Sequence, residues 1–166
     1  MSKTRDLVLT ALLVAVVFVA TYFRVPTGPT GGLVHLGTVA LFVICVVFGP
    51  KKGAIAGAFG MALFNLTTEW AVWAPYTFVI RIVMGYIMGS VAHFGGAGGK
   101  KPVRNVLALV AGGAWFIPAA YAAELMIFRV QWQVPVASIP GNVMQLVLAL
   151  VAGLPLATLI SRHRPR

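Results

Sequence analysis

Residues 65–81, Asn-Leu-Thr-Thr-Glu-Trp-Ala-Val-Trp-Ala-Pro-Tyr-Thr-Phe-Val-Ile-Arg, join two apolar segments. The joint carries Asn65, Glu69 and Arg81 in a chain that otherwise has few charged residues. Ionisable groups are costly to bury at membrane depth, so their presence there indicates a functional role. This stretch therefore predicts two membrane helices with a polar site near the point where they meet.

The composition is that of a polytopic membrane protein. Of the 166 residues, 60% are hydrophobic and 10% are charged, against about 25% charged residues in an ordinary soluble domain. The net charge of +10 arises from short basic clusters between apolar runs, so membrane topology explains it better than nucleic-acid binding does. A chain of this size is expected to form a single helical domain, residues 1–166. The single cysteine, Cys45, leaves no disulfide framework.

Six apolar runs are separated by turn-forming residues such as Gly49-Pro50, and about 20 such residues span a bilayer. Their continuous hydrophobicity disfavours a strand barrel. The first run is not followed by a small-residue cleavage site, so we expect a retained span rather than a signal peptide. The sequence predicts an all-α, six-transmembrane-helix bundle with helices near 6–23, 37–49, 52–69, 75–94, 103–128 and 139–161. Small residues spaced by four, such as Gly85 and Gly89, are expected to pack helices together.

Lysine and arginine residues are distributed asymmetrically between the two sides of this bundle. Arg24 and Arg129 fall on one side and Arg81 lies within a span. The other ten fall on the opposite side: Lys3, Arg5, Lys51, Lys52, Lys100, Lys101, Arg104, Arg162, Arg164 and Arg166. Because cytoplasmic loops are enriched in these residues, we expect both termini of this multi-pass protein in the cytoplasm.

Polar side chains from four of the predicted helices fall at one level near the outer ends of the spans. Helix rise puts Arg81 about 9 Å and Glu124 about 6 Å below the outer boundary. Asn65 and Glu69 are expected to share a helix face, as are Asn142 and Gln145. The deeper parts of the spans hold almost nothing polar, which argues against an ion path and favours an outward-facing pocket. Its candidate ligand-binding residues are Asn65, Glu69, Trp73, Arg81, Tyr121, Glu124, Asn142, Gln145 and, from the preceding loop, His35.

Each of these residues also has a structural interpretation. Arg81 and Glu124 are able to neutralise one another instead of binding a ligand. Tryptophans such as Trp73 are expected at a membrane interface in any case. His35 is placed either to reach over the pocket mouth or to cap the second helix. These alternatives stay open on the sequence alone.

Catalytic motifs are weak. Ser90 and His93 have helical spacing for a nucleophile and base, but they fall at the cytoplasmic end, away from the other polar residues. The histidines, His35, His93 and His163, are divided between the two sides of the membrane, so no histidine-based metal site is expected. Residues 95–99 lack the pattern of a phosphate-binding loop. We therefore expect no enzyme activity, no metal and no cofactor.

Three motifs in order resemble a known family. They are Gly-Gly-Leu-Val-His-Leu-Gly at 31–37, Phe-Gly-Pro-Lys-Lys-Gly at 48–53 and, after 65–75, Thr-Phe-Val-Ile-Arg-Ile-Val-Met-Gly at 77–85. Together they resemble the S components of energy-coupling factor (ECF) vitamin transporters. The chain is most similar to the branch associated with hydroxymethylpyrimidine and pyridoxine-type substrates.

The resemblance implies a protein of the bacterial plasma membrane that captures a small vitamin from outside. Its implied partners are a transmembrane coupling protein and two cytoplasmic ATP-binding-cassette ATPases, which hydrolyse the ATP. The family contacts the coupling protein through small residues of the first helix, here Ala11 and Ala15, and covers the ligand with a loop that corresponds to 24–36. Relatives often have Lys where this chain has Arg81 and an acid where it has Thr38, which leaves the contacts at these two positions open.

Two other functions compete with this one. The chain is also compatible with a small structural or assembly protein of the membrane, in which the outer polar groups only hold the bundle together. The same residues are also compatible with an S component for a different vitamin, such as riboflavin, thiamine or pantothenate. The sequence does not name the vitamin.

Overall fold

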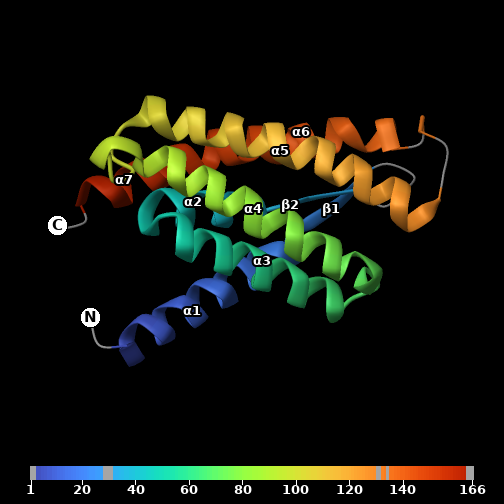
Figure 1. The fold of residues 1–166 in the computed structure, drawn as a ribbon, viewed down its shortest axis with the longest axis horizontal. Coiled ribbons are helices and arrows are strands. Elements are labelled where there is room, and N and C mark those ends of the chain that lie inside the picture. The colour runs from blue at the N-terminus through green and yellow to red at the C-terminus, as the bar shows by residue number, and fades with distance from the viewer. Residues whose placement is uncertain (1–2, 28–31, 130–131, 134, 164–166) are drawn as a thin grey trace.

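The computed structural model describes residues 3–27, 32–129, 132–133 and 135–163, and most of them are helical (Figure 1). The first five helices are α1 (Lys3–Tyr22), α2 (Gly37–Phe48), α3 (Pro50–Leu66), α4 (Ala74–His93) and α5 (Pro102–Phe128). The last apolar run forms α6 (Ile139–Leu148), the π turn η4 (Ala149–Gly153) and α7 (Leu154–His163) in direct succession. The 3-10 turns are η1 (Ala71–Trp73), η2 (Phe94–Gly96) and η3 (Pro135–Ser138). The predicted all-α class is confirmed, and the helix ends lie within about three residues of those expected.

Four helical stretches are long and apolar enough to cross a membrane: Lys3–Tyr22, Ala71–Gly96, Pro102–Phe128 and Pro135–His163. α2 has 12 residues and α3 has 17, which at 1.5 Å per residue cover only about 18 Å and 25 Å. The hydrocarbon core of a bilayer is about 30 Å thick. The structure is thus that of an α-helical membrane protein, while six complete spans stay a prediction.

α2 is apolar around its whole circumference because it lies in the middle of the bundle. It packs against α1, α3, α4 and α7, and its residues Leu41, Phe42 and Cys45 are completely buried. Met84 and Met88 of α4 belong to the same core. A helix that is hydrophobic on all sides is expected in such a position.

α3 and α4 approach closely through small residues. A Cβ atom added at Gly89 would lie 2.4 Å from the Cα of Pro50, and one at Gly85 would lie 2.9 Å from the backbone of Ala54. No side chain fits at these distances, so both glycines allow the two backbones to touch. The expectation that this pair packs helices together is confirmed.

The segment expected to be a loop at 24–36 contains a β-hairpin. Strand β1 (Arg24–Thr27) pairs antiparallel with β2 (Gly32–His35), with Arg24 opposite His35 and Val25 opposite Val34; residues 28–31 lie outside the described part. The hairpin connects α1 to α2 and packs against α6. It places His35 at the end of β2, just before the start of α2.

The two ends of the bundle differ in the connections they carry (Figure 1). The start of α1, the end of α7, the α2–α3 turn and the α4–α5 connection lie at one end, on the left in the view. The α3–α4 turn and the α5–α6 connection lie at the other end. Of the predicted cytoplasmic lysines and arginines, those that the structure describes lie at the first of these ends: Lys3, Arg5, Lys51, Lys52, Lys100, Lys101, Arg104 and Arg162. That it faces the cytoplasm stays a prediction.

Candidate ligand pocket

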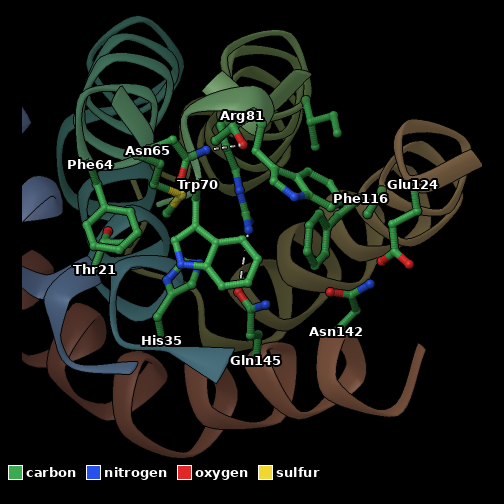
Figure 2. A pocket seen from close by; sticks show the side chains of 15 residues that line it. Thr21, His35, Phe64, Asn65, Trp70, Arg81, Phe116, Glu124, Asn142 and Gln145 are labelled. Carbon is green, nitrogen blue, oxygen red and sulfur yellow. Dashed lines mark hydrogen bonds between the residues drawn. The ribbon is translucent and has the colours of Figure 1, made fainter. Parts of the chain in front are cut away.

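A pocket opens between the hairpin and the ends of α3, α4, α5 and α6 (Figure 2). The space between its walls is about 620 Å³, including the part open to solvent, and its free cavity volume is about 80 Å³. The latter is enough for a few waters and small for a ligand pocket, so any ligand larger than this requires the walls to move. The lining residues are Thr21, His35, Met61, Phe64, Asn65, Trp70, Trp73, Thr77, Ile80, Arg81, Phe116, Ala120, Glu124, Asn142 and Gln145.

Arg81 extends from α4 into this pocket and is 5% exposed. Its guanidinium carbon lies 4.1 Å from the centre of the Phe116 ring, which is the distance of a cation–π contact. One guanidinium nitrogen donates to the thioether of Met84 at 3.2 Å, and another lies 3.4 Å from Oε1 of Gln145. In the described part of the chain the ion pairs are Arg24–Glu69 and Lys52–Asp6. Arg81 therefore has no acidic partner among these residues.

Gln145 of α6 is hydrogen-bonded to the first turn of α2. The hydroxyl of Thr38 donates to Oε1 of Gln145 at 2.7 Å, and both residues are buried. Because Oε1 also faces Arg81, the carbonyl side of this amide is turned toward two donors (Figure 2). The polar residue at position 38 thus acts through Gln145 and does not itself line the pocket.

Glu124 of α5 lies on another part of the wall, beside Asn142 of α6 (Figure 2). The hydroxyl of Ser138 donates to Oε2 of Glu124 at 3.0 Å, and Glu124 is 2% exposed. In Figure 2, Phe116 separates Glu124 from Arg81. The sequence left open whether Arg81 and Glu124 neutralise one another. In the structure these two residues do not form an ion pair with each other.

Two further polar atoms of the wall lack partners among the described residues. They are Nδ1 of His35 and Nε1 of Trp73, both buried. Buried polar atoms are nearly always hydrogen-bonded, so such exceptions require an explanation. Burial, with the nearby charges of Arg81 and Arg24, lowers the pKa of His35 to about 3. The imidazole is therefore neutral at physiological pH and has one donor and one acceptor nitrogen.

The N-terminal end of α2 brings the hairpin close to α1. A Cβ atom at Gly37 would lie 2.2 Å from Oγ1 of Thr21 and 2.9 Å from Nδ1 of His35. Only a glycine permits this approach, so Gly37 helps to hold His35 against the pocket. On the opposite side, Nδ2 of Asn65 donates to Oγ1 of Thr77 at 2.7 Å, which ties α3 to α4.

Seven of the nine candidate residues line the pocket, and two do not. Glu69 lies beyond the end of α3 at Leu66, so the helix face it was expected to share with Asn65 does not exist. Its carboxylate pairs with Arg24 at 2.8 Å and accepts from Nε1 of Trp70 at 2.9 Å. A hydrogen bond from its own backbone N–H, aided by the charge of Arg24, lowers its pKa. Tyr121 points elsewhere, and its hydroxyl donates to the carbonyl of Trp132 at 2.6 Å.

The apolar part of the wall was largely missed by sequence reasoning. Phe64 and Phe116 line the pocket, but each is one aromatic residue in a long apolar run and carries no distinguishing signal. Thr77 and Thr21 are also part of the lining, and threonines are common enough in membrane helices to be overlooked. Trp70 also lines the pocket.

The alternative enzyme residues lie away from this pocket. His93 is the last residue of α4, and its Nε2 is 2.9 Å from the carbonyl oxygen of Val46. Ser90 belongs to a separate surface depression with Phe94 and Arg104. In the described residues, His, Cys, Asp and Glu do not gather in groups of three or more.

Comparison with known proteins gives two similarities. Residues 1–162 match the family described as "ECF-type riboflavin transporter, S component". Over 75 residues the chain is also 32% identical to a protein of Pyrococcus woesei described as "Uncharacterized protein in gap 3'region". That alignment covers 45% of this chain and 50% of the other, so the chain spans about half the length of the curated relative it matches.

Proposed function

Since this chain belongs to the family of ECF-type riboflavin transporter S components, we propose that its pocket captures a one-ring vitamin or vitamin precursor from outside the cell. The family consists of integral membrane proteins that serve vitamin uptake with an energy-coupling module, and its members are not themselves enzymes. Hydroxymethylpyrimidine and pyridoxine-like compounds are the substrates we propose. A transmembrane coupling protein and two ATPases are the partners we propose for the transport step.

The convergence of polar side chains on one pocket is the observation that supports this function most. Residues from β2, α3, α4, α5 and α6 meet there, although they are far apart in the sequence. The buried Nδ1 of His35 and Nε1 of Trp73 lack partners in the described part of the chain, and ligand atoms would satisfy them. A few directional polar groups within an aromatic wall are typical of small-molecule sites.

The size of the pocket bears on the choice among vitamins. With about 80 Å³ of free volume, the walls have to move less for a single substituted ring than for the three fused rings of riboflavin. A pyrimidine or pyridine also offers ring nitrogens and hydroxyls to donors and acceptors on several sides. Riboflavin, thiamine and pantothenate are the alternatives that a binding experiment has to include.

The binding experiment uses the purified protein and a panel of water-soluble vitamins and precursors. Mass spectrometry identifies any small molecule that co-purifies, and tryptophan fluorescence measures the titrations. Trp70 and Trp73 line the pocket, whereas Trp132 is 65% exposed and lies outside it. We expect Trp73→Phe to reduce the fluorescence change and Trp132→Phe to retain it. If no compound of the panel binds, the proposed function is wrong even though the fold stands.

The coupling step has its own experiment. Ala11 and Ala15 lie on the exposed side of α1, where a partner helix is able to approach closely. We expect Ala11→Leu with Ala15→Leu to abolish vitamin uptake by the complete complex and to leave binding intact. Ala122→Leu, on the exposed side of α5, is the matched control. Uptake at the full rate by this chain without coupling protein and ATPases would contradict the partner proposal.

A structural role without a ligand is the competing function. It predicts that Arg81→Gln lowers the melting temperature equally with and without the vitamin panel. The binding function predicts that Asn142→Ala weakens ligand binding with little effect on the melting temperature of the unliganded protein.

A further inference from the structure

A depression with a charged residue lies at the end of the bundle opposite the candidate ligand pocket. It opens between α4 and α5 and has a volume of about 330 Å³, which is within the size range of small-molecule sites. Ser90 and Val91 line it from the last turn of α4, and Arg104 and Leu107 from the start of α5. Phe94 completes the lining from the connection between the two helices, on the left in Figure 1. The depression shares no residue with the candidate ligand pocket.

The guanidinium group of Arg104 packs against the α4–α5 connection. Its carbon lies 5.6 Å from the centre of the Phe94 ring, which is within the range of a cation–π contact. Nη1 is buried and has no hydrogen-bond partner among the described residues. A Cβ atom at Gly95 would lie 3.2 Å from Nη1, so the glycine leaves room for the guanidinium group beside the turn. Arg104 as a whole is only half-buried, and a ligand in the depression is able to reach it.

The acidic side chains of the protein are all placed away from Arg104. The chain has three acidic residues, and Asp6 and Glu69 form the two ion pairs already described. Glu124 lies near the other end of α5, about 30 Å from Arg104 by helix rise. In the described part of the chain, Arg104 therefore has no acidic side chain to pair with. A buried donor without a partner requires an explanation, and an anion from outside the chain provides one.

The surroundings of Arg104 combine positive charge with exposed apolar side chains. Lys100 and Lys101 are exposed immediately before α5. Phe94 and Val103 are each 74% exposed and Leu107 is 54% exposed. Both helices belong to stretches long and apolar enough to cross a membrane, so this region lies where the chain leaves the bilayer. Basic residues at the end of a membrane helix attract anionic lipid headgroups, and the apolar residues beside them favour a molecule that also has hydrocarbon chains.

We propose that this depression binds an anionic phospholipid by its headgroup phosphate. Arg104 donates to the phosphate oxygens, and the hydroxyl of Ser90 donates a further hydrogen bond. An acyl chain of the lipid lies against Val91 and Leu107 along the groove between α4 and α5. The site is separate from the vitamin pocket and does not depend on which vitamin that pocket binds.

The test is native mass spectrometry of the full-length protein in detergent, titrated separately with phosphatidylglycerol and phosphatidylcholine. The two lipids share the phosphate and the acyl chains, but only phosphatidylglycerol has a net negative charge. We expect it to bind at least about fivefold more tightly, the factor that one basic residue near an anionic headgroup provides. An excess of glycerol 3-phosphate, which lacks acyl chains, should leave the lipid bound. Equal binding of the two lipids, or complete displacement by glycerol 3-phosphate, overturns the proposal.

Variants assign the lipid to this depression. Arg104→Gln should remove the preference for phosphatidylglycerol. Arg162→Gln removes the same charge from an exposed position at the same end, outside the depression, and should keep the preference. Leu107→Trp fills the apolar part of the groove at an exposed position, so it provides a second test if Arg104→Gln does not fold, and it should weaken binding of both lipids. Equal losses in the two arginine variants, or unchanged lipid binding by Leu107→Trp, would show that the lipid is not held here.

Discussion

Thr38 illustrates how a residue outside the pocket sets the chemistry inside it. Its hydroxyl holds Oε1 of Gln145 at 2.7 Å, whereas the contact of the same oxygen with Arg81 is 3.4 Å. The shorter bond therefore fixes the orientation of the amide. The neutral hydroxyl at this position thus leaves the carbonyl oxygen of Gln145 facing both Thr38 and Arg81.

Thr38→Val is expected to weaken binding of the tightest vitamin about threefold to tenfold, because a hydrogen bond of this kind contributes about 0.5–1.5 kcal/mol. The size and shape of the side chain are kept, so the melting temperature should fall only by the few degrees that the loss of one hydrogen bond costs. Thr158→Val is the matched control, since the buried Oγ1 of Thr158 has no partner among the described residues. Unchanged binding by a folded Thr38→Val protein would contradict the role given to this hydroxyl.

His35 makes the stability of the protein depend on pH in a defined direction. Its pKa is lowered from 6.5 to about 3 by burial, then by Arg81 and Arg24. As the pH falls below about 6.5 the unfolded chain takes up a proton at His35 and the folded protein does not, so stability is lost between about pH 6.5 and pH 3. At pH 5 the loss is about 2 kcal/mol.

The measurement is the melting temperature of the unliganded protein in detergent at pH 7.5 and pH 5. We expect the melting temperature to fall more between pH 7.5 and pH 5 for the natural protein than for His35→Gln, which has no imidazole to titrate. The other acidic and basic groups, including Arg81, Arg24 and Glu69, are common to both proteins, so their contributions cancel in the comparison. Equal decreases in the two proteins would show that His35 is not held in its neutral form by the fold.

At the scale of single elements, the contact between α3 and α4 is the most sensitive part of the bundle. Gly89→Ala would place a methyl group 2.4 Å from the Cα of Pro50, and a backbone cannot move aside as a flexible side chain does. Overpacking of this kind costs about 1–3 kcal/mol, so we expect a clearly lower melting temperature. Ala122→Val, on the exposed side of α5, should have little effect. A Gly89→Ala protein as stable as this control would contradict the close packing.

Helices were predictable from the sequence because their limits are set by local chemistry. α5 was expected at 103–128 and spans Pro102–Phe128; a proline suits the first turn, where no N–H bond is needed. α3 ends earlier than expected because the hydroxyls of Thr67 and Thr68 bond the carbonyls of Leu63 and Phe64 and complete its last turn. That competition between side chain and backbone cannot be read from hydrophobicity alone.

The β-hairpin and the apolar wall of the pocket were not predictable in the same way. The strands Arg24–Thr27 and Gly32–His35 have four residues each, too few for an alternating pattern to be recognised among glycines and prolines. Charged and amide residues in apolar runs are conspicuous, so Arg81, Glu124 and Gln145 were found. Phe116 was missed because its role depends on a contact with Arg81 of another helix.

At the scale of the whole molecule, the direction of the pocket depends on the direction of the bundle. The pocket lies at the end with the hairpin, opposite the end where α1 begins and α7 ends (Figure 1). The basic residues predict that the latter end faces the cytoplasm. If the orientation were reversed, the pocket would open inward and capture of a vitamin from outside would fail.

Cysteine labelling in intact cells decides this orientation. The natural Cys45 is completely buried, so the unchanged protein should not react with a membrane-impermeant maleimide and serves as the background. We expect Arg129→Cys, at the exposed end of α5 beside the pocket side, to be labelled in intact cells. Lys100→Cys, exposed at the opposite end, should be labelled only after the cells are permeabilised. Labelling of Lys100→Cys but not Arg129→Cys in intact cells would reverse the topology, and the outward-facing binding site would then be excluded.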